Sequence, residues 1–179
     1  MKKKKLPSLI KSIKKQNFKL KEIILVDDGS RDFTPDIGRK FKIKVITLNK
    51  SPRGWIGKSW ACYNGAKIAT GDYLLFLDAD TMLCPGAIEK ISSCLYKYRG
   101  AVSIQPYRRI KKFYENLSLF FNIILIAGIG VSTPLQSRVR PIGAFGPCLI
   151  CSRSDYFKVQ GHRGIKGKVL EDIEIGKKL

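Results

Sequence analysis

The sequence has little acidic charge and almost no histidine. Among its 179 residues, 34 lysines and arginines stand against only 14 acids, which gives a formal net charge of +20. Such an excess indicates a polyanionic neighbour, which can be nucleic acid, an anionic bilayer or a phosphorylated substrate. The single histidine, His162, cannot by itself build a zinc site or a catalytic triad.

The sequence also lacks a regular cysteine pattern. Its five cysteines are an odd number without even spacing, which favours a reducing compartment over a disulfide framework. Cys148 and Cys151 have a spacing that could suggest zinc. We expect both on one strand, where side chains three positions apart point to opposite faces, so we predict buried thiols instead.

We expect the opening residues not to act as a secretory signal, because the lysines after the first methionine precede no continuous apolar run. A later stretch, residues 117–135, approaches the length of a membrane span and has basic flanks. Polar and helix-breaking residues inside it, such as Asn122 and Pro134, weaken that interpretation. A core helix or an interfacial helix fits the stretch at least as well.

Apolar runs alternate with amphipathic segments along the first 105 residues. Helices are expected over 7–17, 34–41, 58–69 and 85–98, and strands over 22–26, 43–48, 73–77 and 101–105. This order predicts one α/β domain, a sandwich with a mostly parallel sheet and helices on both faces. The opening helix has no preceding strand to complete a right-handed crossover, and the chain stops in a helical pattern. We therefore expect a partial domain that is cut at both ends.

Acidic pairs follow two of the predicted strands. Asp27 and Asp28 end the first, and Asp78 and Asp80 end the third. Ligands of parallel α/β sheets bind beyond the carboxyl ends of the strands. Because neighbouring carboxylates raise one another's pKa unless a cation holds them, the pattern favours Mg²⁺ or Mn²⁺ bridging to phosphates. Helix capping or a solvated turn is the alternative.

Four stretches together carry a family resemblance. In order along the chain they are "LVDDGSRDFT", "ATGDYLLFLDADT", "GAFGPCLICSRSDYFKVQGH" and "VLEDIEIG". Their order and spacing resemble family 2 glycosyltransferases of the GT-A fold. Two further stretches, "GWIGKSWACYNGA" and "SIQPYRRIKKFYE", are similar to bacterial membrane-associated glucosyltransferases of the carotenoid type. Nothing in the chain matches the apolar first strand, of the type "VSIIIPARNE", with which the family begins.

The resemblance implies a GT-A nucleotide-diphospho-sugar transferase sandwich that lacks its first strand. Residues 1–105 would form the nucleotide-sugar-binding half, and residues 106–179 the acceptor-side half. The implied activity is inverting transfer from a nucleotide-diphosphate donor, a UDP-sugar, to a lipid or carotenoid-like acceptor. The implied location is the cytoplasmic face of the cell membrane. There the chain would contact an anionic surface, either peripherally or anchored by segments outside it, and would bind no nucleic acid.

The resemblance also assigns the donor side of the site. Asp27 and Asp28 would hold the uracil and ribose of the donor, with Asp28 at the ribose. Asp80 would ligate a divalent Mn²⁺ or Mg²⁺, and Asp78 would lie nearer the sugar or ribose while also serving the metal. Apart from the resemblance, Lys58 lies near a glycine-rich turn that is expected to open a helix, where the lysine and the first backbone N–H groups would steady the diphosphate or sugar hydroxyls.

On the acceptor side, the resemblance makes Asp172 the general base, with Glu171 beside it. If the acceptor is itself a carboxylate, Asp172 needs only to orient it. Acids in the first turn of a helix are also common for dipole reasons. Trp55 and His162 are further candidates for contact with the acceptor or diphosphate; a core aromatic ring and a local hydrogen bond are their alternatives.

Other function classes stay open at the level of sequence. A basic nucleic-acid-binding protein fits the charge, but no recognition motif is present and the lysines are scattered. A catalytically inactive remnant of a glycosyltransferase fits the apparent lack of a first strand. A nucleotidyltransferase shares the acidic strand ends but usually has a glycine-rich amino-terminal loop.

Overall fold

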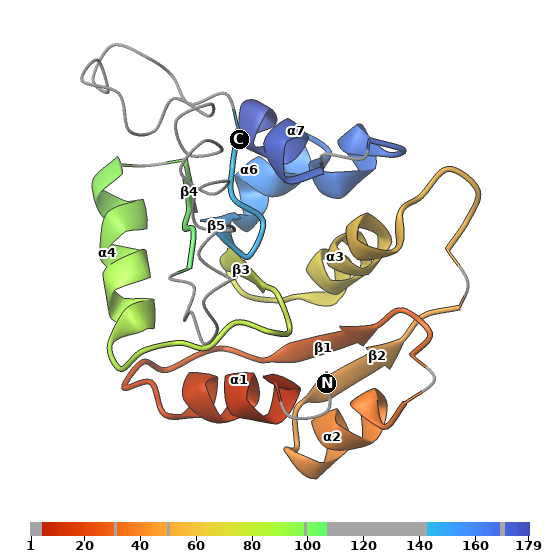
Figure 1. Ribbon diagram of the computed structural model, residues 1–179. Coiled ribbons are helices and arrows are strands. Elements are labelled where there is room, and N and C mark those ends of the chain that lie inside the picture. Colours follow the sequence, from red (N-terminus) through yellow and green to blue (C-terminus); the bar gives the residue numbers. More distant parts are fainter. Residues whose placement is uncertain (1–4, 31, 50, 99, 107–142, 169–170) are drawn as a thin grey trace, which may run out of the picture.

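The computed structural model describes residues 5–30, 32–49, 51–98, 100–106, 143–168 and 171–179. Helices and strands alternate along its first part (Figure 1). The elements are α1 (Lys5–Lys14), β1 (Ile24–Asp27), α2 (Thr34–Lys40), β2 (Lys44–Thr47), α3 (Gly57–Ile68), β3 (Tyr73–Leu77), α4 (Ala87–Tyr98), β4 (Ala101–Ser103), β5 (Cys148–Ser152), α6 (Arg153–Lys158), the 3-10 helix η3 (Gly161–Ile165) and α7 (Glu171–Lys178). Every element expected over the first 105 residues forms, with ends that differ by a few residues.

The described strands form two sheets. β1 and β2 make a parallel pair, while β5 lies between β3 and β4 and runs antiparallel to both. β3 and β4 therefore point the same way. β1 also runs in the direction of β3, because the residues after both strands lie beside the start of α3, and Glu22 before β1 bonds to Thr70 before β3. All described strands except β5 thus share one direction, as the predicted mostly parallel sheet requires.

The two sheets are covered by amphipathic helices. In α1, the apolar residues Leu6, Leu9, Ile10 and Ile13 recur at helical spacing and are all buried, whereas the three lysines of the helix are exposed. Figure 1 places α1 and α2 along the β1–β2 pair and α4 beside β4. The helices therefore hold the strand ends in place from outside the sheets.

Strand β5 divides the core into two parts. Leu149 and Cys151 face a cluster with Tyr156 of α6 and Ile175 of α7, and Cys148 and Ile150 face a second cluster beneath α4. The two cysteines therefore lie on opposite faces, as the strand prediction required. All five cysteines are free, and burial raises the pKa of Cys148 to about 11 and of Cys151 to about 12.

Some features were not predicted, and one prediction lies beyond the described residues. The sequence pattern did not indicate α6 and η3, which are short and follow β5 directly. The apolar stretch 117–135 falls outside the described residues. Within the described part of the chain, none of the helices is both long and apolar enough to cross a membrane.

Candidate active site

Lys58, in the first turn of α3, gathers three carboxylates around one ammonium group. Its Nζ lies 3.2 Å from Asp78 Oδ1, 3.4 Å from Asp172 Oδ1 and 3.7 Å from Glu171 Oε1. Asp78 directly follows β3, and the other two acids open α7. Lys58 therefore connects three of the predicted site residues that come from distant parts of the sequence.

The charge balance of this cluster has two opposing causes. Burial by itself would lower the pKa of Lys58, but the carboxylates of Asp172, Asp78 and Glu171 outweigh it and raise the pKa above its ordinary value. The ammonium group is therefore charged at neutral pH. Three carboxylates against one ammonium still leave an excess of negative charge, which attracts a further cation.

Two glycines allow the carboxylates to approach the backbone. A Cβ at Gly57, the first residue of α3, would meet Oδ2 of Asp28, and a Cβ at Gly146 would meet the carboxylate of Asp172. Gly57 thereby joins Asp28, after β1, to the Lys58 cluster. The acids that follow β1 and β3 and the acids of α7 thus lie around the same helix start.

Glu171 is held by a residue that the sequence did not reveal as part of the site. Ser59 Oγ donates a hydrogen bond to Glu171 Oε2, and both residues are buried. A serine at the start of a helix is ordinary in sequence, so no signal separated it from a capping residue. Its role depends on α3 and α7 meeting in space.

Asp27 combines burial with an unsatisfied oxygen. It ends β1 and is only 2% exposed; its Oδ1 accepts a hydrogen bond from the Ser30 N–H at 3.2 Å. Its Oδ2 has no hydrogen-bond partner within the described residues. The local turn that was the alternative to ligand binding is therefore present, but it uses one oxygen and leaves the other able to accept a donor.

Asp80 lies two residues beyond Asp78 and is largely exposed. It pairs with Lys5 Nζ of α1 at 3.1 Å. The described part of the chain holds no group of three or more His, Cys, Asp or Glu residues that could enclose a metal. Mg²⁺ and Mn²⁺ sites often use one or two carboxylates plus substrate phosphates and water, so Asp78 and Asp80 fit such an ion when a diphosphate supplies the other ligands.

His162 lies in the 3-10 helix η3 and is buried. It is 3% exposed, its Nδ1 lies 2.8 Å from the Tyr156 hydroxyl, and its backbone N–H donates to the same hydroxyl. Burial, followed by the nearby positive charge of Lys58, lowers the pKa of His162 to about 4. The imidazole is therefore neutral at pH 7. Its contact with the Tyr156 hydroxyl is the local hydrogen bond that was the alternative to a contact with the acceptor or diphosphate.

Trp55 lies in an aromatic cluster at the start of α3. Its ring contacts Trp60 edge-on with ring centroids 5.0 Å apart, and its ring centroid lies 5.3 Å from that of Tyr63.

Cys62 lies one turn along α3 from Lys58. Burial raises the pKa of Cys62 to about 12, so this thiol is not a nucleophile at neutral pH. The described side chains here thus supply charge and apolar surface rather than an activated nucleophile.

Comparisons with known proteins bear on this geometry. The sequence model of the family described as "Glycosyl transferase family 2" matches residues 2–148. The chain is 39% identical over 179 aligned residues to the 4,4'-diaponeurosporenoate glycosyltransferase of Staphylococcus haemolyticus. The aligned region covers 97% of this chain and 48% of that protein. The chain spans about half the length of the curated relatives it matches.

Solved structures share the fold. The crystal structure of S. aureus TarS 1-349 superposes with a TM-score of 0.66 at 20% identity, covering 99% of this chain and 51% of that one. Glucosyl-3-phosphoglycerate synthase from Mycobacterium tuberculosis, in complex with Mn²⁺, UDP and glucosyl-3-phosphoglycerate, has a TM-score of 0.57 at 20% identity. That match covers 84% of this chain and 52% of that one. The likeness confirms the predicted GT-A class of fold.

Proposed function

Because the chain belongs to glycosyl transferase family 2, we propose that it binds a UDP-sugar where β1 and β3 end and transfers the sugar, with inversion, to a lipid-like acid. The observation that carries the proposal is the Lys58 cluster. It brings acids that follow a strand and acids that open α7 to one helix start, beside Asp28. A donor held between β1 and β3 would therefore face the acids of α7.

The nucleoside would be recognised by Asp27, the last residue of β1, and by Asp28, which follows it. The unsatisfied, buried Oδ2 of Asp27 suits an imide N–H, which is the donor that uracil offers. Asp28 is exposed and lies against Gly57, where ribose hydroxyls could donate to it. An uncompensated buried carboxylate oxygen is unfavourable in the free protein, and a donor from the ligand removes that cost.

The diphosphate would lie at the start of α3. Lys58 offers an ammonium group there, and the first backbone N–H groups of this 12-residue helix, which lack intrahelical partners, would donate to phosphate oxygens. Asp80, together with Asp78, would hold Mn²⁺ or Mg²⁺ along with the phosphate oxygens. A divalent ion bound there would neutralise the negative charge that grows on the departing UDP.

The acceptor would approach from the side of α7. An acceptor oxygen attacks the anomeric carbon, the bond from that carbon to the diphosphate breaks, and its electron pair leaves with UDP. The relative's name identifies a carotenoid carboxylate as its acceptor. A carboxylate needs no deprotonation, so here Asp172 would orient the acceptor, whereas for a hydroxyl acceptor it would take the proton. Ser59 and Lys58 would fix Glu171 and Asp172 in position.

The surroundings of the acceptor follow from its chemistry. A carotenoid-like acid resides in a bilayer, so the chain would work at a membrane, at its cytoplasmic face where nucleotide sugars are found. The net charge of +20 suits an anionic lipid surface. This location is part of the proposal.

Calorimetric titration of UDP into the chain, with and without Mn²⁺, tests the proposal. We expect Mn²⁺ to tighten UDP binding, and Asp80→Asn to remove that gain while leaving the fold intact. Asp36→Asn is the matched control, because Asp36 pairs with Arg39 on the surface of α2, outside the cluster. Absence of any UDP binding, together with salt-sensitive binding to DNA, would contradict the proposal and support a nucleic-acid-binding protein.

A further inference from the structure

The loop between β3 and α4, residues 78–86, carries both aspartates that are proposed to hold the divalent ion. The N–H and the hydroxyl of Thr81 donate hydrogen bonds to the Asp78 carbonyl oxygen, at 3.0 and 2.7 Å. These bonds close a tight turn from Asp78 to Thr81, with Asp80 at one of its corners. Local bonding therefore fixes the backbone of Asp80 relative to Asp78, but it does not fix the loop relative to the rest of the chain.

Polar side chains of α1 and of the residues just after it hold the other half of this loop. Ser12 Oγ accepts a hydrogen bond from the Leu83 N–H at 3.1 Å. The Gln16 side chain, two residues beyond the end of α1, donates to the Cys84 carbonyl at 2.9 Å and accepts from the Ile88 N–H at 3.3 Å. Backbone groups of a loop need such partners, because no regular secondary structure supplies them. The loop and the start of α4 are thus attached to α1 by side-chain hydrogen bonds.

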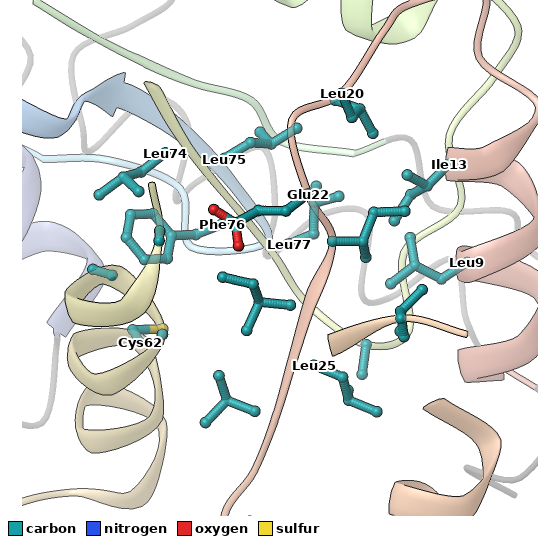
Figure 2. A pocket seen from close by; sticks show the side chains of 18 of the residues that line it. Leu9, Ile13, Leu20, Glu22, Leu25, Cys62, Leu74, Leu75, Phe76 and Leu77 are labelled. Atoms are coloured by element: carbon teal, nitrogen blue, oxygen red, sulfur yellow. The ribbon is translucent and has the colours of Figure 1, made fainter. Parts of the chain in front are cut away.

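The apolar face of α1 in turn fixes the helix beside the strands. Leu9 and Ile13 are buried, and Figure 2 shows both pointing toward a cavity that Leu25 of β1 and Leu77 of β3 also line. Leu77 is the residue directly before the loop. Apolar burial therefore sets the position of α1 next to the strand that leads into the loop, so its polar side chains provide a support that does not depend on the loop itself.

Lys5, the first residue of α1, reaches the aspartate at the turn. Its Nζ lies 3.1 Å from Asp80 Oδ2, and the two side chains are 49% and 61% exposed. Asp78 pairs instead with Lys58, which two further carboxylates hold in place. Exposed ion pairs between single partners contribute little to stability. Of the two aspartates, Asp80 is thus the one whose lysine can be displaced at small cost.

We propose that α1 controls the access of the divalent ion to Asp80. Lys5 and the ion compete for Asp80 Oδ2, because an ammonium group and a divalent cation repel one another at one carboxylate oxygen. Ser12 is a positioning residue, which keeps the loop in place when Lys5 leaves, so that Asp80 stays beside Asp78 and the diphosphate. This competition rests on the proposed function, which makes Asp80 a ligand of Mn²⁺ or Mg²⁺.

Binding of Mn²⁺ in the presence of saturating UDP tests the competition. Electron paramagnetic resonance measures free Mn²⁺ directly, so no catalytic turnover is needed. Lys5→Gln should tighten Mn²⁺ binding about two- to fivefold, because the ion no longer has to break an exposed ion pair. Lys11→Gln is the matched control, because it removes the same charge from an exposed position of the same helix, and it should leave Mn²⁺ binding unchanged.

Ser12 is tested by measuring two affinities separately. Ser12→Ala should weaken Mn²⁺ binding about fivefold, because the Leu83 N–H loses its acceptor and the loop is held less firmly. UDP affinity without Mn²⁺ should stay unchanged, since the proposed nucleoside contacts of Asp27 and Asp28 do not involve this loop. Ser12→Thr keeps the hydroxyl and should restore wild-type Mn²⁺ binding. A purely structural role of Ser12 would instead lower both affinities together.

Four results would overturn the proposal. If Mn²⁺ tightens UDP binding to the wild type but Lys5→Gln changes nothing, the competition is wrong while the proposed function stands. An equal gain in Lys11→Gln would make the effect one of net charge. If Ser12→Ala weakens both affinities, or neither, Ser12 is not a positioning residue. If neither the wild type nor Lys5→Gln binds Mn²⁺ with UDP, the competition and the metal part of the proposed function are both wrong.

Discussion

At the scale of single residues, the buried carboxylate of Asp27 is expected to favour UDP binding at a cost to the stability of the free chain. Its buried Oδ2 lacks a partner within the described residues, while Oδ1 accepts from Ser30. In Asp27→Asn, the amide oxygen can keep the bond to Ser30, and burying an amide costs less than burying a charge. We therefore expect the free energy of unfolding to stay the same or rise by up to about 1 kcal/mol. UDP affinity should fall at least about tenfold, because an amide N–H would then face the imide N–H.

Urea unfolding and calorimetric titration on the same preparation check both halves of this prediction. Asp36→Asn on the surface of α2 is the matched control and should change neither quantity. A clear loss of stability together with unchanged UDP affinity would show that Asp27 serves the fold alone.

His162 links pH to stability. Burial lowers its pKa to about 4 in the folded chain, against an ordinary value near 6.5. The unfolded chain therefore takes up this proton first as pH falls. The contribution of neutral His162 is complete above about pH 6.5 and is lost progressively down to about pH 4. The linked loss is at most about 3 kcal/mol.

Comparison of wild type with His162→Gln by urea unfolding, from pH 7 to pH 4.5, isolates this effect. The variant should be less stable at pH 7, because the contact with Tyr156 is disturbed, but its stability should fall less steeply with acid. The lowered pKa values of Glu22 and Glu174 act equally in both proteins and cancel in the difference. Parallel pH profiles for the two proteins would contradict the buried neutral imidazole.

At the scale of elements, the sequence predicted the strands and the acids at their ends, because both signals are local. The run from Tyr73 to Leu77 forms β3 with the expected bounds, and Asp78 follows it directly. The antiparallel insertion of β5 between β3 and β4 could not be predicted, because strand order depends on long-range pairing. The assignments of Asp80 to a metal and Asp172 to the acceptor stay predictions.

The Lys58 cluster shows why the rest of the site was out of reach. Sequence placed Lys58 near a glycine-rich turn and the Glu171–Asp172 pair near a helix start, but nothing in the spacing joined them. Their meeting depends on how α7 packs beside α3, and Ser59 acquires its partner only through that packing. The role of Gly146 could not be predicted either, because it depends on the close approach of the Asp172 carboxylate, which an added Cβ at Gly146 would meet.

Helix α7 packs very closely on residues 143–146. A glycine-to-alanine substitution, which usually stabilises a helix, should therefore lower the free energy of unfolding at this contact. Alanine normally stabilises a helix relative to glycine by roughly 1 kcal/mol. At Gly176, however, an added Cβ would meet the backbone nitrogen and the Cβ of Ala144. Gly176→Ala should therefore destabilise the chain by about 1–3 kcal/mol, as overpacked cores do.

Urea unfolding measures this change, and Ser93→Ala on the exposed face of α4 reports the ordinary helix-propensity effect of alanine. If Gly176→Ala raised the free energy of unfolding as that control does, the close contact between α7 and Ala144 would be wrong. Such a result would also loosen the placement of Asp172 on the same helix.

At the scale of the whole molecule, scarce acids gather in one place. Six of the 14 acids are the predicted site residues Asp27, Asp28, Asp78, Asp80, Glu171 and Asp172. The remaining chain therefore carries 34 basic residues against 8 acids (14 minus 6), a formal charge of +26 (34 minus 8) compared with +20 for the whole chain. An acidic site in a cationic molecule separates two tasks: the acids suit a metal and polar groups, while the outer charge suits an extended anionic surface.

That separation predicts salt-dependent membrane binding. The chain should sediment with vesicles that contain phosphatidylglycerol and remain in solution with phosphatidylcholine alone, because each basic residue near an anionic surface contributes about 1 kcal/mol. Raising the salt from about 0.1 M to 1 M shortens the screening length from about 10 Å to about 3 Å and should weaken binding more than tenfold. Lys58→Gln should leave vesicle binding unchanged, because Lys58 is engaged with the three carboxylates. Equal binding to both kinds of vesicle, insensitive to salt, would instead indicate insertion of apolar residues and would contradict an electrostatic contact.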